Sequence, residues 1–144
     1  MFSRDYLIRL IEQAGDFLAR IAGLERQGKF ESGLREVERA YDALLDMDRT
    51  LFNIAPSSTI ADLLGPPERI RAIAQLVRAE ADLLRLSGDP INAQLKYKRA
   101  LELYLEARSR GGEEEDDREF IQKTVLHVDQ MTLAPKYRAG VSWP

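Results

Sequence analysis

The sequence contains no cysteine and only one histidine among its 144 residues. Without cysteine, the chain forms neither disulfides nor thiolate metal sites, and a reducing compartment such as the cytoplasm is the expected location. His127 also lacks the glutamate three residues before it that a helical di-iron carboxylate site requires. We therefore interpret His127 as a structural or surface residue, and we expect no metal and no cofactor.

Long hydrophobic runs and a strong net charge are also lacking. Arg4, Asp5, Arg9 and Glu12 interrupt the apolar N-terminal segment, which therefore does not resemble a signal peptide. No segment approaches the roughly 20 apolar residues of a membrane span, so no membrane partner is expected. The 21 basic and 24 acidic side chains are interspersed and give a net charge of -3. Because nucleic-acid binding requires a basic stripe, no nucleic-acid partner is expected either.

The residue patterns of known catalytic sites are missing as well. The sequence has no glycine-rich phosphate loop, no zinc-like ligand spacing and no nucleophile elbow. Tyr41, Tyr97 and Tyr104 fall at helical spacing, where packing with the hydroxyl at the surface is the ordinary interpretation and a ligand cage is the alternative. The sequence therefore predicts a protein that is not an enzyme.

What the sequence does contain is helical periodicity. Apolar side chains recur three and four positions apart over residues 3–27, which predicts a helix with a buried stripe. The stripe consists of Leu7, Leu10, Ile11, Ala14, Phe17, Leu18, Ile21 and Leu24. A second periodic segment, 30–45, follows after only Gly28 and Lys29. Because this connection is so short, we expect the two helices to pack as an antiparallel hairpin.

The next stretch, 47–65, is irregular and contains Pro56. Within it, Thr59 and Asp62 resemble a capping box for a helix of one or two turns that ends at Gly65. We interpret this stretch as a packed connector.

Two longer helices are predicted over 67–87 and 90–108. Between them, Gly88-Asp89-Pro90 supplies a C-terminal glycine, an N-capping aspartate and a proline suited to the first helical position. The apolar residues of the first are Ile70, Ile73, Leu76, Val77, Ala81 and Leu84. Those of the second are Ile91, Leu95, Ala100, Leu101, Tyr104 and Ala107.

Five consecutive acidic residues, 113–117, open a predicted fifth helix that extends to 132. Acidic side chains suit the positive end of a helix, so a solvated helix start is the ordinary interpretation, and a metal or basic-partner site is the alternative. Trp143 lies in the polar tail that follows, where it docks on this chain, docks on a neighbour or is disordered.

These segments together predict an all-α fold with about five main helices and a short connector helix. We expect a single helical domain over 1–133, made of a hairpin (3–45), the connector (47–65), a second hairpin (67–108) and a capping helix (113–132), followed by a C-terminal tail (134–144).

The two hairpins also resemble each other, because Gly28 and Gly88 are each followed twelve residues later by an alanine. The second unit carries Gly88-Asp89 at its turn, Ala93 at a small position, Tyr97 at an aromatic position and Ala100-Leu101-Glu102-Leu103 at its close. This pattern resembles the tetratricopeptide repeat, whose stacked hairpins bind a protein or peptide on a concave surface. The turns lie 60 residues apart rather than the usual ~34, so the connector is expected to interrupt the stack.

The opening segment, 2–13, further resembles a family of small uncharacterised bacterial helical proteins with the same layout. That resemblance covers most of the chain and implies a bacterial helical protein without a known activity.

The predicted function is a non-catalytic helical scaffold that mediates protein-protein interaction. Two alternatives remain open: a protein that only self-associates, and a small-molecule binder or enzyme with a pocket between the hairpins. The tetratricopeptide resemblance places candidate partner-binding residues at Gln75, Arg78, Asp82 and Arg85. The two arginines are suited to bind a carboxylate, or they are solvated or paired with Asp82.

The first helix is apolar around more of its circumference than one neighbour requires. Phe2, Tyr6 and Ile8 lie outside its buried stripe and are candidate self-association residues. We therefore expect a homo-oligomer, in the simplest case a homodimer.

Overall fold

The computed structural model describes residues 2–142, which form eight α-helices and no strand. In chain order these are α1 (Arg4–Arg26), α2 (Phe30–Leu44), α3 (Arg49–Ile54), α4 (Ser57–Leu64), α5 (Pro67–Leu86), α6 (Pro90–Gly111), α7 (Asp117–Val125) and α8 (Pro135–Gly140), with a 3-10 turn at Gln130–Thr132. The all-α prediction is confirmed.

The longer helices begin and end at the signals that the sequence provides. Ser3 Oγ accepts a hydrogen bond from the backbone N–H of Tyr6 at 3.1 Å and so caps α1. Asp89 caps α6 in the same way through the N–H of Asn92 at 3.3 Å. Gly28 turns the chain between α1 and α2 with a φ of 72°, a conformation that glycine adopts without strain.

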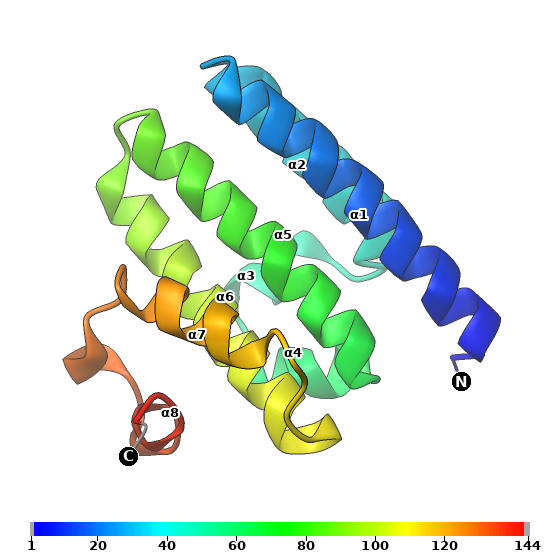
Figure 1. Ribbon diagram of the computed structural model, residues 1–144, viewed down its shortest axis with the longest axis vertical. Helices are drawn as coiled ribbons and strands as arrows, with labels where there is room; N and C mark the ends of the chain where they lie inside the picture. The colour runs from blue at the N-terminus through cyan, green and yellow to red at the C-terminus, as the bar shows by residue number, and fades with distance from the viewer. Residues whose placement is uncertain (1, 143–144) are drawn as a thin grey trace.

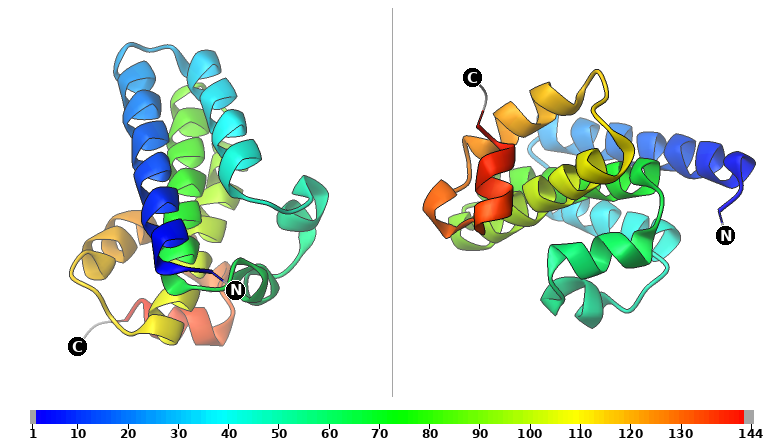
Figure 2. Two further views of the ribbon diagram at one scale, coloured as in Figure 1. Left: turned by 90° about the vertical axis from the view of Figure 1, so that its right-hand side faces the viewer. Right: turned by 90° about the horizontal axis from the view of Figure 1, so that it is seen from below.

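Helix α5 lies at the centre of the fold. Figure 1 shows α1 and α2 as one antiparallel pair and α5 and α6 as another. Both helices of the first pair contact α5, and α4, α7 and α8 pack against α6 (Figure 2). The predicted inner face of α5 is confirmed, since Ile70, Ile73 and Leu76 have no exposed surface.

Small residues allow the two pairs to approach closely. A Cβ atom at Gly33 would lie 2.8 Å from Leu83 Cδ2, so α2 and α5 touch at this position without room for a larger side chain. Ala93, at the small position of the second unit, is buried. The close approach of α2 and α5 explains why a small residue occupies position 33.

The connector differs from its prediction because it forms two short helices, not one. Asp48 Oδ1 caps α3 through the N–H of Leu51 at 3.1 Å. Helix α4 begins at Ser57, so Thr59 lies inside the helix and the predicted capping box is wrong. The predicted end at Gly65 is confirmed. The connector is packed, with Phe52, Ile60 and Leu64 buried.

The C-terminal region also differs from the prediction. Residues 113–116 are not helical and include a turn at 115–116, and α7 ends at Val125, so the predicted helix over 113–132 was too long. The side chain of Asp117 accepts a hydrogen bond from the N–H of Glu114 at 2.7 Å and shapes this turn. The tail forms α8, and Tyr137 packs against α6. Trp143 lies outside the described residues.

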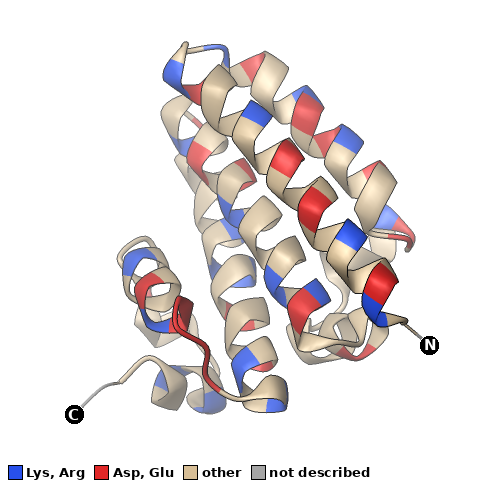
Figure 3. Ribbon diagram, turned by 45° about the vertical axis from the view of Figure 1, so that its right-hand side comes forward, with Lys and Arg blue, Asp and Glu red and all other residues tan. Residues whose placement is uncertain are grey.

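Charged residues are interspersed over the outer surface, apart from the acidic turn before α7 (Figure 3). Among the helices in 2–142, none is both long and apolar enough to cross a membrane.

Two buried arginines fix helix ends to α5. Arg69 donates hydrogen bonds to the carbonyls of Leu64 and Leu45, at 3.1 and 2.8 Å, and thereby binds the ends of α4 and α2. Arg71 donates to both carboxylate oxygens of Asp117 at 2.9 Å, which fixes the start of α7. Buried charges require such partners.

Candidate binding clefts

A shallow depression between α1, α5 and α7 contains three of the four predicted partner-binding residues. We call it the α5 hollow; its lining includes Leu18, Ala22, Glu25, Gln75, Arg78, Asp82 and Phe120. Its volume is about 280 Å³. The prediction that Gln75, Arg78 and Asp82 share one surface is therefore consistent with their positions.

The two arginines of this prediction already have partners in the chain. Arg78 stacks over the ring of Phe120 at 4.2 Å. Arg85 is not part of the hollow lining, because its Nε donates to the hydroxyl of Tyr97 at 3.0 Å and its guanidinium lies 3.8 Å from Asp82. Tyr97 in turn donates to Asp82. Burial, together with this bond to a carboxylate, raises the pKa of Tyr97 to about 12.

Phe2, a predicted self-association residue, contacts its own chain. The Arg69 guanidinium lies 5.0 Å from its ring, and a Cβ at Gly65 would come within 2.9 Å of the same ring. Tyr6 and Ile8 are exposed, at 37% and 44%. Ile11, expected in the buried stripe, is 45% exposed because α1 lies at the edge of the fold and contacts only α2 and α5 closely.

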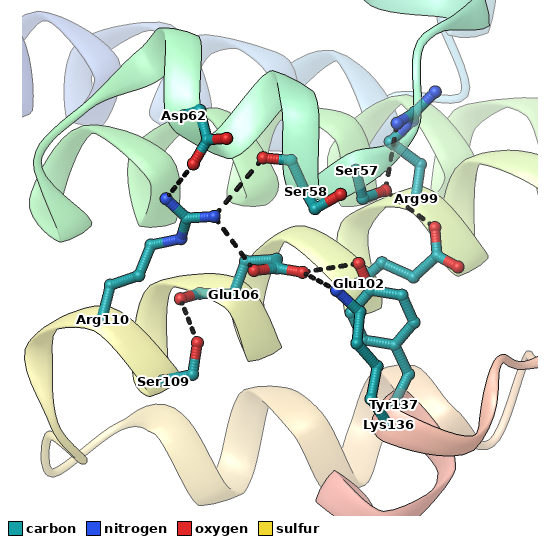
Figure 4. Close-up of polar contacts among 10 residues, drawn as sticks. All are labelled: Ser57, Ser58, Asp62, Arg99, Glu102, Glu106, Ser109, Arg110, Lys136 and Tyr137. Atoms are coloured by element: carbon teal, nitrogen blue, oxygen red, sulfur yellow. Dashed lines mark hydrogen bonds and ion pairs between the residues drawn. The ribbon is translucent and has the colours of Figure 1, made fainter.

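A larger cavity lies elsewhere, between the α3–α4 connector, α6 and the segment around α8. We call this cavity of about 850 Å³ the α6 cleft. Its apolar lining includes Phe52, Ile54, Ala55, Leu84 and Leu95, and its cations are Lys96, Lys98, Arg99 and Lys136. Figure 4 shows the polar contacts along one side of it.

Large apolar side chains at this cleft are exposed. Ile54 is 75% exposed and Leu95 is 62% exposed, and both line the cleft. Ile91, one turn before Leu95 on α6, is 76% exposed. Ile91 and Leu95 are among the apolar residues that the sequence assigns to this helix, and the structure leaves both of them exposed.

The cations of the cleft differ in their partners. Lys96 lies 3.6 Å from the Glu80 carboxylate. Lys98 donates to the carbonyl of Thr132 at 3.0 Å. Within residues 2–142, neither Lys98 nor Arg99 forms an ion pair at 4 Å or less.

Arg99 binds neutral oxygen atoms. It donates to Ser57 Oγ at 3.0 Å and to the carbonyl of Asn53 at 3.3 Å. Ser57 in turn donates to Glu102 at 2.8 Å, so Glu102 reaches Arg99 only through this hydroxyl (Figure 4). Burial lowers the pKa of Arg99 from its ordinary value, and the nearby charge of Glu102 offsets this only in part.

A buried carboxylate fixes α8 next to the cleft. Glu106 accepts hydrogen bonds from Tyr137 at 2.6 Å, Lys136 at 2.9 Å and Arg110 at 3.2 Å (Figure 4). Burial alone would raise the pKa of Glu106, but these three donors outweigh it and hold the pKa below its ordinary value. This carboxylate is therefore charged and fully bonded, which suits a structural role.

The family models, curated proteins and solved structures include no match to this chain. The tetratricopeptide resemblance therefore stays a prediction. In the described part of the chain, no three acidic or histidine side chains come close enough together to hold a metal ion. His127 stacks on Tyr97, with ring centroids 4.2 Å apart.

The α6 cleft was missed by sequence reasoning because its walls come from three separated segments. One signal was present in the sequence: Ile91, Leu95 and Arg99 recur every four residues along one side of α6. Because successive residues differ by about 100° around a helix, this stripe lies nearly opposite the buried face that carries Ala93, Tyr97 and Leu101.

Proposed function

We propose that this chain is a non-catalytic helical scaffold that binds a segment of a partner protein in the α6 cleft. The observation that carries the proposal is an open cavity of about 850 Å³ that combines exposed apolar side chains with hydrogen-bonding cations. Binding sites commonly combine an apolar lining with a few polar groups that fix orientation.

The exposed apolar side chains supply a driving force for binding. Ile54 and Leu95 lie at the cleft with most of their surface in contact with water. Covering a side chain of this size contributes roughly 1–3 kcal/mol. A partner with apolar side chains that cover Ile54 and Leu95 therefore gains binding free energy that a small polar ligand in the same cleft does not gain.

The layout supports the finer proposal of a tetratricopeptide-like scaffold. Two antiparallel helix pairs lie side by side, and the α5 hollow is lined by the first helix of each pair together with α7. In the tetratricopeptide family, the corresponding helices line the concave binding surface. The absence of cysteine is compatible with the proposed cytoplasmic location.

Site-specific crosslinking tests the proposed cleft. A photo-reactive benzoylphenylalanine in place of Leu95 is expected to give a discrete adduct in cells of the source organism. The same residue in place of Leu126, which is 80% exposed and is not part of the cleft lining, is the matched control. Equal labelling from both positions, or no adduct from Leu95, contradicts binding in the α6 cleft.

Self-association through α1 is a second candidate function. Ile8, Ile11 and Gly15 follow one another at three- and four-residue spacing, and the space beside Gly15 is open. Such a seam lets a second helix approach closely. A photo-reactive residue in place of Ile8 tests this candidate. It is favoured if that position gives an adduct with twice the mass of one chain and a photo-reactive residue in place of Leu95 does not.

A further inference from the structure

The α6 cleft is locally positive on a chain that is negative overall. Four cations, Lys96, Lys98, Arg99 and Lys136, line it, together with the two carboxylates of Glu80 and Glu102. The whole chain carries a net charge of -3. The excess of positive charge therefore belongs to this surface and does not follow from the overall composition.

Two cations of the lining, Lys98 and Arg99, form no ion pair among residues 2–142, and Glu102 approaches Arg99 only through the Ser57 hydroxyl. Lys96 is paired with Glu80, and Lys136 is paired with the buried Glu106. Lys98 and Arg99 bind only neutral oxygens. A guanidinium offers five N–H donors and pairs best with a carboxylate, which it binds through two parallel hydrogen bonds.

We infer that the segment bound in the α6 cleft is acidic, with one carboxylate side chain on Arg99, a second near Lys98 and an apolar side chain over Leu95. This inference rests on the proposed function and names the chemistry of its partner. Because the cations are spread over α6 and α8, they match several acidic side chains better than a single terminal carboxylate.

The spacing along α6 defines the order of these side chains. Leu95 and Arg99 lie one helical turn apart, a rise of about 5.4 Å to 6 Å. In an extended peptide, side chains on the same face are two residues apart, or about 6.8 Å. The partner segment is therefore expected to place an aspartate or glutamate two positions from a large apolar residue.

Selection from a random library of twelve-residue peptides displayed on phage tests the inference. The expected peptides carry at least two acidic residues, one of them two positions from Leu, Ile or Phe. Selected peptides that lack acidic residues would overturn the inference, although they would still support a peptide-binding cleft if Leu95→Ser and Ile54→Ser abolish their binding.

Fluorescence anisotropy with one selected, synthesised peptide then measures the role of each cation. Arg99→Gln is expected to weaken binding about tenfold, Lys98→Gln about threefold, and Arg99→Lys to an intermediate extent, since lysine keeps the charge and loses the two-pronged geometry. Arg9→Gln, on an exposed part of α1, is the matched control and is expected to leave binding unchanged.

Two further results separate failure of the inference from failure of the proposed function. If Arg99→Gln and Lys98→Gln both bind with wild-type affinity while Leu95→Ser does not bind, the inference is wrong and the cleft is still the binding site. If no selected peptide responds to Leu95→Ser or Ile54→Ser, the proposed function is wrong as well. Should Arg99→Gln lose its helical circular dichroism, Lys98→Gln decides the question, because its side chain has a single bond to a carbonyl.

Discussion

The α5 hollow and the α6 cleft lie on opposite sides of α5 and use their arginines differently. Asp82 in the hollow and Leu84 in the cleft are two residues apart, which places them about 200° apart around the helix. In and beside the hollow, Arg78 and Arg85 are engaged by aromatic rings and hydroxyls of their own chain. In the cleft, Arg99 binds only neutral oxygens. Position on a helix face thus shows where an arginine lies, whereas contacts from other segments decide whether it is available to a partner.

Substituting Asp117 breaks one wall of the α5 hollow and is expected to have the largest effect. Asp117→Ala removes the buried carboxylate partner of Arg71 and leaves only the exposed Glu114 carboxylate at 3.5 Å, which costs about 3–5 kcal/mol of unfolding free energy. Urea denaturation measures the loss. The control is Lys123→Ala, which removes an exposed ion pair and is expected to cost less than about 0.5 kcal/mol. A loss below about 1 kcal/mol for Asp117→Ala contradicts the proposed role of this pair.

Substituting Tyr137 tests the wall of the α6 cleft. Tyr137→Phe removes a buried hydroxyl that donates to the Glu106 carboxylate and is expected to cost about 2 kcal/mol at pH 7. Tyr6→Phe, at an exposed tyrosine of α1, is the matched control and should change stability by less than about 0.5 kcal/mol.

The stability lost in Tyr137→Phe is expected to depend on pH. Because the pKa of folded Glu106 is lowered from 4.5, its charge stabilises the fold above that value, and this stability is lost as the pH falls through the lower, folded pKa. The difference in unfolding free energy between wild type and Tyr137→Phe is therefore expected to be full at pH 7 and to shrink as the pH falls below 4.5. Thermal unfolding of both proteins, measured from pH 7 down to acidic pH, tests this expectation. If the stability difference between them grows on acidification, the charged Glu106 carboxylate is not the acceptor of the Tyr137 hydrogen bond.

The double substitution Arg78→Ala and Arg85→Ala sharpens the comparison of the two surfaces. The loss of a cation-π contact and a hydrogen bond is expected to cost about 1–2 kcal/mol in total, with the helical circular dichroism unchanged. Binding of an acidic peptide in the α6 cleft is expected to persist, as measured by anisotropy. If the folded double variant no longer binds, the partner occupies the α5 hollow, as the sequence predicted.

The smallest effect on stability is expected at the exposed edge of α1. Ile8→Ser should change the unfolding free energy by less than about 0.5 kcal/mol, because the side chain is 44% exposed. If α1 forms the self-association surface, light scattering on a sizing column will show the variant shifted from dimer to monomer. Leu126→Ser, at another exposed apolar residue, should leave the dimer intact. A wild-type monomer at high micromolar concentration contradicts self-association.

The long helices were predictable because their limits depend on local chemistry. Ser3, Gly28 and Asp89 act on backbone groups only a few residues away, so one sequence is enough to interpret them. The short helices depend on distant residues. Arg99 bonds the α3–α4 connector and Glu106 bonds α8, across 30 to 46 positions, and no local sequence pattern indicates such contacts.

The same distinction applies to the candidate sites. The tetratricopeptide resemblance named Gln75, Arg78 and Asp82, and all three line the α5 hollow. It did not show that Phe120 lies beneath Arg78, because α7 follows more than 30 residues later and its register on α5 is set by packing. The α6 cleft exists only once the connector and α8 are placed, so its cations looked like ordinary solvated side chains on a polar face.

The buried guanidinium of Arg69 has a consequence for how the molecule opens. Besides Leu45 and Leu64, it contacts the ring of Phe2, so the N-terminus, the end of α2 and the end of α4 all meet at one charge. Removing any of these segments exposes a desolvated cation or strips it of its acceptors. The backbone amides of α2, α4 and the start of α5 should therefore exchange with deuterium in one concerted opening, and the connector, although it joins two helix pairs, will not behave as an independently fluctuating loop.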